Sequence, residues 1–229
     1  MNQTQQVVET MKKLGGAATF GKLNSLMDFS DWKTSTPEAS VRRIVQDSPA
    51  FFRIRPGLWG LEEQKDEILK KFNIKLDDKD APNEFSHSYY QGLAVEIGNF
   101  KEMKTFIPNQ DKNKLFVDRP LKNVANLSEI YQFTYEGLIK YASTVDVTWF
   151  NKRKMPNAFF EIEHSTDFKN SLLKFSELQD FNAKFYIVAD EYRKKQFNKI
   201  VSEYSTFESI NARVKFLSYE SLADTVFHL

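Results

Sequence analysis

Two short apolar segments of the chain carry acidic residues where a buried strand would normally carry only hydrophobic side chains. Asp146 lies within residues 145–150, and Glu161 and Glu163 alternate with apolar residues at 158–164. The side chains of a strand point alternately to its two faces, so Glu161 and Glu163 share one face. If the two segments are adjacent strands, the three carboxylates converge, and a cation or a proton must relieve their repulsion. Oxygen ligands of this kind suit Mg²⁺ or Mn²⁺.

The elements that would position these carboxylates alternate between strands and helices. The polar residues 151–157 separate the two acidic segments and predict the turn of a hairpin. Hydrophobic patterning predicts further elements, with helices at 86–101, 128–140, 168–178 and 191–203 and strands at 104–107, 114–117 and 184–189. The pattern indicates an α+β or α/β domain in which helices flank a mixed sheet. A half-exposed hairpin with solvated acids is the alternative, which the strongly apolar strands disfavour.

An Asp on one strand of a hairpin and Glu-x-Glu on the next resembles the PD-(D/E)XK nuclease superfamily, whose motif is an Asp, a variable gap, then Asp or Glu, any residue and Lys. Asp146 matches the first acid and Glu161 the second. The resemblance implies a restriction-endonuclease-like fold and a Mg²⁺ ion, for which Mn²⁺ can substitute, held by Asp146 and Glu161. It also places Glu96, in the first helix of the domain, where members carry a further metal-shell carboxylate. The default for an isolated helical Glu is an exposed or ion-paired side chain.

The third motif position departs from the superfamily pattern, because it holds Glu163 where Lys is usual. Two readings are open. In the one we favour, Glu163 itself orients or deprotonates the attacking water. In the other, an amine arrives from the following helix, where Lys169 and Lys174 are available. We expect Asp146, Glu161 and Glu163 to be catalytic, and the resemblance implies products with a 5′-phosphate and a 3′-hydroxyl.

Residues 1–62 have the pattern of three helices followed by a hairpin. Helical spacing of apolar residues begins after Thr4, a candidate N-cap, and a second helix is predicted at 20–27. A third helix starts after Thr36, a good N-cap, and the proline that follows suits the first helical position. Two alternating runs around Pro56-Gly57 predict the hairpin. This order indicates a winged-helix domain, and the segment resembles the HARE-type helix-turn-helix family, whose members commonly accompany DNA-modifying and DNA-cleaving enzymes.

In winged-helix proteins the third helix enters the major groove and the wing contacts phosphates. The positions that this arrangement assigns to DNA binding are Thr34, Ser35, Thr36, Ser40, Arg42, Arg43, Arg53 and Arg55. The stretch 32–60 is locally basic, although the net charge of the whole chain is only +1, which gives some weight to a protein without a nucleic-acid partner. A three-helix docking module with a solvated basic face is the alternative.

The charged and polar stretch 63–84 predicts a linker with a short helix at 65–72. We therefore expect a winged-helix domain at 1–62, this linker, and a nuclease domain at 85–229. A loop at 109–113, rich in Asn, Gln and Lys, could contact bases. Further candidate contacts to the DNA backbone lie in the predicted hairpin turn, namely Lys152, Arg153 and Lys154. A solvated turn is equally expected there.

Composition excludes several classes of chemistry. The chain of 229 residues has no cysteine, which rules out disulfides and thiolate chemistry. It has neither an apolar run of membrane-spanning length nor a signal-peptide pattern, so we expect a soluble cytoplasmic protein without a membrane partner. Three scattered histidines argue against a zinc site, and His164 is expected to be a hydrogen-bonded structural residue. No Gly-rich phosphate loop occurs, so no nucleotide cofactor is expected.

Together these features predict a Mg²⁺-dependent, sequence-specific endodeoxyribonuclease. The simplest form is a type II restriction endonuclease that cleaves double-stranded DNA as a homodimer, because a palindromic target favours two symmetric active sites. One alternative is a non-catalytic DNA-binding regulator with a nuclease-like dimerisation domain, which Glu163 at the Lys position would permit. Another is a modification-dependent or repair nuclease.

Overall fold

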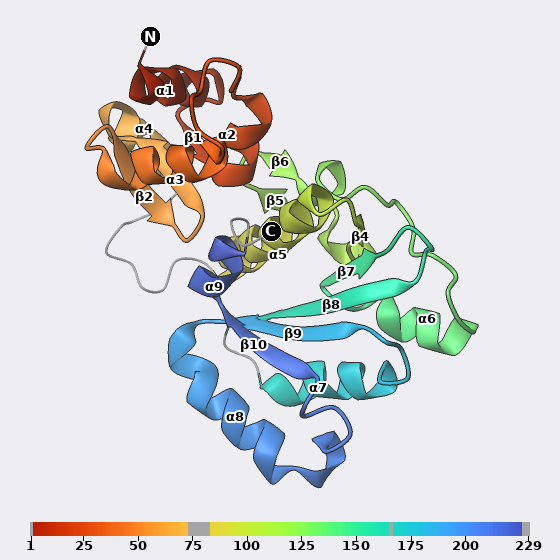
Figure 1. Ribbon diagram of the computed structural model, residues 1–229. Coiled ribbons are helices and arrows are strands. Elements are labelled where there is room, and N and C mark those ends of the chain that lie inside the picture. The colour runs from red at the N-terminus through yellow and green to blue at the C-terminus, as the bar shows by residue number, and fades with distance from the viewer. Residues whose placement is uncertain (1, 73–82, 165–166, 226–229) are drawn as a thin grey trace. The chain divides into compact units, whose positions relative to one another are not determined.

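The computed structural model describes residues 2–72, 83–164 and 167–225. The chain divides into two compact units, one formed by residues 1–81 with 223–229 and the other by residues 82–222. Figure 1 colours the chain from the red N-terminal helix to the blue C-terminal elements. Each unit contains a hydrophobic core of its own, so the two are described separately.

The first unit packs helices against a small antiparallel sheet of order β1-β3-β2. Its elements are α1 (Gln3–Lys13), β1 (Ala17–Thr19), α2 (Phe20–Leu26), α3 (Pro37–Asp47), β2 (Phe51–Arg55), β3 (Leu58–Leu61) and α4 (Lys65–Lys71). Apolar residues at helical spacing, including Val7, Met11, Val41 and Val45, meet in one core. The three helices and the hairpin predicted from sequence are confirmed as elements, and the short helix expected after them is α4.

Local signals explain where these helices begin. The N-cap of α1 is Asn2 and not Thr4, because Asn2 and Gln5 form a capping box in which each side chain bonds the backbone N–H of the other, at 2.8 and 3.1 Å. Thr36 occupies the N-cap position of α3, as predicted, but its side chain makes no capping hydrogen bond; Pro37 fills the first helical position. The sequence pattern does not reveal β1, since three residues are too few to show a period.

The second unit is built on a five-stranded sheet of order β10-β9-β8-β7-β4 (Figure 1). Its strands are β4 (Lys104–Phe106), β7 (Val147–Phe150), β8 (Pro156–Glu163), β9 (Lys184–Ala189) and β10 (Val214–Ser218). Strands β4, β7 and β8 are antiparallel neighbours, whereas β8, β9 and β10 run parallel. The sheet is therefore mixed, as predicted, with β8 at its centre. Two short strands, β5 (Leu115–Phe116) and β6 (Arg119–Pro120), form a separate ribbon.

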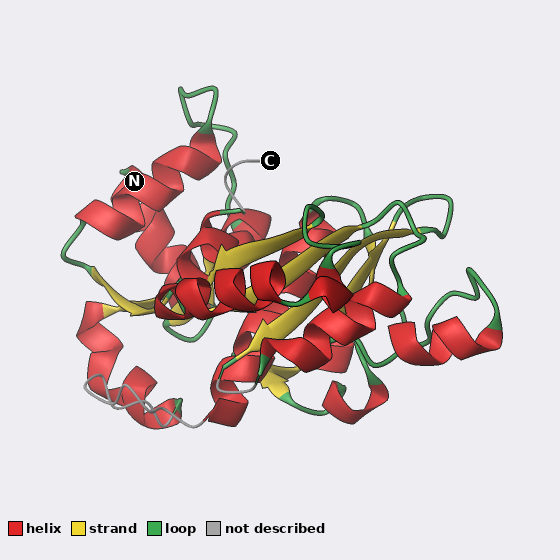
Figure 2. Ribbon diagram, turned by 90° about the horizontal axis from the view of Figure 1, so that it is seen from below, coloured by secondary structure: helices red, strands yellow, loops and turns green. Residues whose placement is uncertain are grey.

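Helices cover both faces of this sheet, and Figure 2 shows some of them in front of the strands. They are α5 (Asn83–Phe100), α6 (Glu136–Ala142), α7 (Phe168–Glu177) and α8 (Lys194–Glu203), and α9 (Tyr219–Asp224) follows β10. On the α5 face, Trp149 packs on Phe160 and donates to the carbonyl of Ala94 at 3.1 Å. On the other face, Phe159 joins the core that includes buried residues of α7 and α8. Neighbouring residues of β8 thus face different helix layers.

One predicted helix is largely wrong. Residues 128–135 are not helical, and only α6 remains of the helix expected at 128–140. The rings of Tyr131 and Phe133 both contact Phe150, with centroids 5.2 and 5.6 Å apart. Side chains two residues apart share a face in an extended chain and not on a helix, so burial of these two rings overrides the helical pattern. Strand β10 was not expected from the sequence pattern.

In the described part of the chain, no helix combines the length and the hydropathy needed to cross a bilayer.

The packing of α5 on the sheet can be tested at Gly98. A Cβ there would lie 2.5 Å from Trp149 Nε1 and 2.7 Å from Thr105 Cγ2, and both of these residues are buried. We expect Gly98→Ala to lower the free energy of unfolding by about 1–3 kcal/mol through overpacking, measured by denaturant unfolding. Gly137→Ala is the matched helical control, because its nearest neighbour belongs to the exposed Tyr135. Equal stability losses in the two variants would contradict the packing argument.

Candidate active site

One cluster of polar side chains lies at the end of the central strand β8. It combines the last residues of β8, the residue before β7 and side chains of α7. Strand β8 carries Glu161 and Glu163, which are only 3% and 6% exposed. Asp146 immediately precedes β7 and does not lie within a strand, and its side chain is 13% exposed. The structure thus brings together the three acids singled out by sequence, through the hydrogen bonds described next.

Glu161 and Glu163 lie on one face of β8, as their spacing requires, and both contact α7. The hydroxyl of Ser171 lies 3.0 Å from Glu161 Oε2 and also hydrogen-bonds Glu163 Oε1. A hydroxyl has only one proton, so it cannot donate fully to both carboxyl groups at once. Ser171 therefore holds two acids close together without neutralising either of them.

Helix α7 also brings an ammonium group to the cluster. Lys174 Nζ lies 2.9 Å from each carboxylate oxygen of Glu161. Lys169, the other candidate amine, instead pairs with Asp167 at 3.8 Å and lies over the ring of Tyr204 at 4.4 Å from its centroid. Of the two lysines proposed from sequence, Lys174 is the one that reaches the carboxylates.

Burial controls the protonation of the central acid. Desolvation and, to a smaller extent, the charge of Asp146 raise the pKa of Glu161, Lys174 and Ser171 lower it, and the net result is a pKa of about 8. The positive charge of Lys174 therefore does not compensate the negative charge and the burial that act on Glu161. A divalent cation would supply the missing positive charge, since bound cations reverse such pKa shifts.

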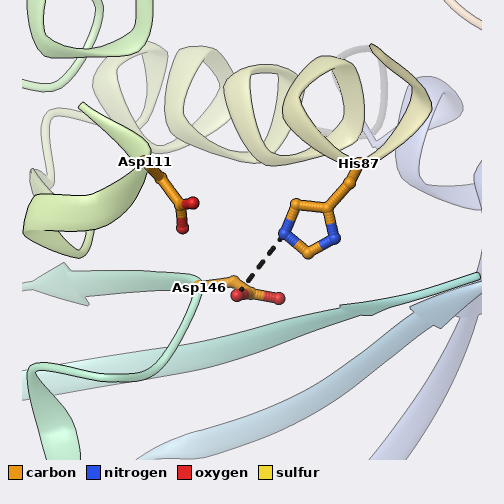
Figure 3. Close-up of side chains that lie close together, drawn as sticks. All are labelled: His87, Asp111 and Asp146. Carbon is orange, nitrogen blue, oxygen red and sulfur yellow. Dashed lines mark ion pairs between the residues drawn. The ribbon is translucent and has the colours of Figure 1, made fainter. Parts of the chain in front are cut away.

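Asp146 connects the sheet to α5. Its Oδ2 accepts a hydrogen bond of 2.7 Å from the backbone N–H of Ile162, and its own N–H lies 3.4 Å from Glu161 Oε1. Its Oδ1 lies 3.5 Å from Nε2 of His87, the pair marked in Figure 3. Burial by itself lowers the pKa of His87, but the hydrogen bond and charge of Asp146, together with the charge of Asp111, outweigh burial and raise it.

Sequence reasoning missed the residues on the α5 side of the cluster. Figure 3 shows Asp111 and His87 pointing toward Asp146, and their ligand atoms all lie within 4.8 Å of one another. Gln91 donates to Asp111 Oδ2 at 3.0 Å and to the carbonyl of Asp146 at 2.8 Å. The i,i+4 spacing of His87 and Gln91 is the one signal that the sequence offered. Asp111 lies in the loop expected to contact bases, yet its carboxylate is turned inward.

Glu96 and the basic hairpin turn lie outside this cluster. Glu96 forms an ion pair with Arg119 at 3.4 Å, and among the described residues it shares no metal-ligand group with Asp146. Its expected role as an additional metal ligand stays a prediction. Lys152, Arg153 and Lys154 join β7 to β8 beyond the end of β7 opposite Asp146, and that end is roughly 13 Å from Asp146 at about 3.3 Å per strand residue. These three residues do not lie beside the carboxylates, and a contact of this turn with the DNA backbone stays a prediction alongside the solvated turn.

His164 faces the layer opposite Glu163, as expected from alternation. Its Nδ1 lies 2.6 Å from the hydroxyl of Tyr219, whose ring stacks on Tyr90 with centroids 3.7 Å apart. These contacts agree with the structural role expected for this histidine.

The DNA-binding positions predicted in the first unit occupy α3, the residues before it and β2. Four of them are exposed, namely Ser35, Thr36, Arg43 and Arg53, and three are partly exposed, namely Thr34, Ser40 and Arg55. Arg42 is also partly exposed and forms an ion pair of 2.6 Å with Asp224 of the same unit. Arg43 and Arg53 are therefore the exposed cations of the predicted set.

The raised pKa of Glu161 predicts a pH dependence of stability without metal. The ordinary pKa is 4.5 and the folded one about 8. Between these values the folded protein keeps a proton that the unfolded chain has released, so stability falls as the pH rises. We expect Glu161→Gln to flatten this profile in unfolding experiments with a chelator from about pH 5 to pH 8. Parallel profiles for the two proteins would contradict the assignment.

Comparison with known proteins places the chain in a family. Residues 69–228 match the family model described as the type II restriction enzyme NmeDI C-terminal domain. The type II restriction enzyme NmeDI of Neisseria meningitidis serogroup C is 30% identical over 127 residues, which cover 49% of this chain and 35% of that relative. The chain thus spans about a third of that relative's length, and no solved structure matches it. Because the family model covers well over half of the chain, the protein belongs to the NmeDI C-terminal domain family of type II restriction enzymes.

Proposed function

We propose that the protein is a type II restriction endonuclease that hydrolyses phosphodiester bonds of double-stranded DNA with Mg²⁺. The observation that carries this proposal is the convergence of Asp146, Glu161 and Lys174 at the end of β8. Membership in a restriction-enzyme family supports it. A mixed sheet with helices on both faces is also what the resemblance to PD-(D/E)XK nucleases implies.

The acids of the cluster suit a hard divalent cation. Asp146 and Glu161 would hold it, because carboxylate oxygens are the ligands that Mg²⁺ prefers. When bound, such an ion polarises the scissile phosphate and lowers the pKa of a coordinated water. The hydrogen bond from the Ile162 N–H to Asp146 fixes one ligand, and the raised pKa of Glu161 indicates a deficit of positive charge around the other.

We assign to Lys174 the amine that the superfamily motif usually places at the position of Glu163. Its support is the contact of 2.9 Å with Glu161, whereas Glu163 hydrogen-bonds Ser171. From there Lys174 would orient the attacking water and stabilise negative charge that develops on the phosphate. Glu163 would then position Ser171 and α7. In the other reading Glu163 activates the water itself, and the two readings differ in the variants below.

The first unit would read DNA as a HARE-type winged helix. Its order α1-β1-α2-α3-β2-β3 and its three-stranded sheet support this assignment. Helix α3 would enter the major groove with Arg43, and Arg53 of β2 would contact phosphate. A homodimer would present one active site to each strand of a palindromic target.

Cleavage of supercoiled plasmid by the full chain with Mg²⁺ tests the proposed activity. We expect discrete fragments, and we expect Lys174→Gln to reduce the rate by about 10²–10³-fold, as for loss of one transition-state donor. Lys169→Gln is the matched control and should retain activity, because Lys169 lies outside the cluster.

Each other outcome has a distinct meaning. Full activity of Lys174→Gln with loss in Glu163→Gln would transfer the role to Glu163. Intact plasmid together with tight duplex binding would overturn the nuclease in favour of a DNA-binding regulator. Cleavage restricted to methylated plasmid would indicate a modification-dependent nuclease.

Binding of duplex DNA tests the proposed role of the first unit. We expect Arg53→Ala to weaken binding measured by fluorescence anisotropy and to reduce the salt slope of log K by about 1, as for loss of one phosphate contact. Lys12→Ala is the control, because Lys12 lies on α1 and pairs with Glu63 at 3.1 Å. An unchanged slope for Arg53→Ala would argue against a wing contact.

A further inference from the structure

His87, Asp111 and Asp146 approach one point from three different elements, as Figure 3 shows. His87 comes from α5, Asp111 ends the 3-10 turn Asn109–Asp111, and Asp146 precedes β7. One ligand atom of each lies within 4.8 Å of the other two. Around a divalent ion with bonds of roughly 2.1 Å, two ligand atoms can be at most about 4.2 Å apart. That limit applies to ligands on opposite sides of the ion, whereas neighbouring ligand atoms are about 3.0–3.4 Å apart, so the three side chains would approach one another by up to roughly 1.5–2 Å to coordinate one ion.

Gln91 provides an independent indication that a cation belongs here. Its side chain is fully buried, and its amide nitrogen donates to both Asp111 and the carbonyl of Asp146. Its Oε1 lies about 2.2 Å from that nitrogen, and no described residue donates a hydrogen bond to it. Reversing the amide would turn the oxygen toward the Asp111 carboxylate, so the orientation is determined. A buried acceptor without a donor, on a side chain that contacts the Asp111 carboxylate and the Asp146 carbonyl, suits a metal ion or its water.

Each of the two acids on this side of the cluster has one basic neighbour. Asp111 is 4% exposed and pairs with Lys114, which reaches its Oδ1 from the surface at 2.9 Å. The carboxylate of Asp146 is opposed here by His87, while Lys174 contacts Glu161. The two oxygens of Asp146 have different surroundings, since Oδ2 accepts from the Ile162 N–H and Oδ1 lies toward His87. Oδ1 is therefore placed to act as a ligand on the α5 side.

We propose that His87, Asp111 and Asp146 form a second binding site, for a divalent transition-metal ion, which shares Asp146 with the carboxylate site of Asp146 and Glu161. An imidazole nitrogen favours transition-metal ions over Mg²⁺, and Mn²⁺ also accepts the two carboxylates. The side chain of His87 is 24% exposed, which leaves a route for the ion from solvent. Asp146 is common to both sites and would lie between the two ions. Binding at this site does not require that the protein cleaves DNA.

Electron paramagnetic resonance of Mn²⁺ added to the metal-free full chain, without DNA, tests this site. We expect the spin-echo signal of bound Mn²⁺ to show coupling to an imidazole nitrogen. His87→Gln should abolish the coupling, and both His87→Gln and Asp111→Asn should weaken Mn²⁺ binding at this site at least about tenfold. A melting temperature close to that of the unmodified chain shows that a variant is folded. If His87→Gln does not fold, the loss of Mn²⁺ affinity in Asp111→Asn tests the site.

Two variants are matched controls for this measurement. His164→Gln removes a neighbouring imidazole that bonds Tyr219, and Glu96→Gln removes a carboxylate paired with Arg119. Both should keep the nitrogen coupling and the affinity. Absence of nitrogen coupling in the unmodified chain, or its persistence in His87→Gln, would overturn the site.

The plasmid assay separates this proposal from the proposed function. Nitrogen coupling in a protein that leaves plasmid intact would retain the His87 site and reject the nuclease. Cleavage with Mg²⁺ by a protein whose bound Mn²⁺ shows no nitrogen coupling would retain the nuclease and reject the His87 site.

Discussion

Repulsion among buried carboxyl groups at the end of β8 is the constraint on which the second unit depends. Glu161 and Glu163 are almost completely removed from water, and Asp146 is nearly so. Burying like charges costs several kcal/mol per ion unless a partner compensates them. The described side chains that oppose Glu161 come from α7, where Ser171 and Lys174 lie one helical turn apart. The position of α7 against β8 is therefore fixed by charge as well as by hydrophobic packing.

The alternation of β8 allows one strand to serve both the core and the cluster. Phe159, on the same face as the two acids, contributes to the core shared with α7 and α8, whereas Phe160 packs on Trp149 beneath α5. Both faces of the strand are apolar over most of its length, as is usual for a central strand with helices on both sides. The acids lie at the end of the strand, where the neighbouring side chains of α7 are the polar Ser171 and Lys174. The hydrophobic core thus stabilises a position that the carboxylates alone would disfavour.

Family membership bears mainly on the second unit. The matched residues 69–228 contain all of that unit, whereas most of the first unit lies outside the match. The assignment of the first unit to DNA reading therefore depends on its own residues, above all the exposed Arg43 and Arg53. The two units also differ chemically, since the second concentrates buried acids and the first presents exposed cations on α3 and β2. The proposed function assigns the binding of a polyanion to the exposed cations and the binding of metal ions to the buried acids.

The sequence by itself determined the hairpin, the shared face of Glu161 and Glu163 and most helix and strand positions, because these follow from periods of two and 3.6 residues. It left open whether the missing motif amine is replaced by Glu163 or by a lysine, since Lys169 and Lys174 are both plausible from spacing. Only the tertiary structure placed Lys174 against Glu161 and Lys169 away from it. The tertiary structure likewise showed that residues 128–135 are not helical, and it brought His87 and Asp111 to Asp146. Contacts between residues 24 to 59 positions apart depend on how helices pack on the sheet, which no local period encodes.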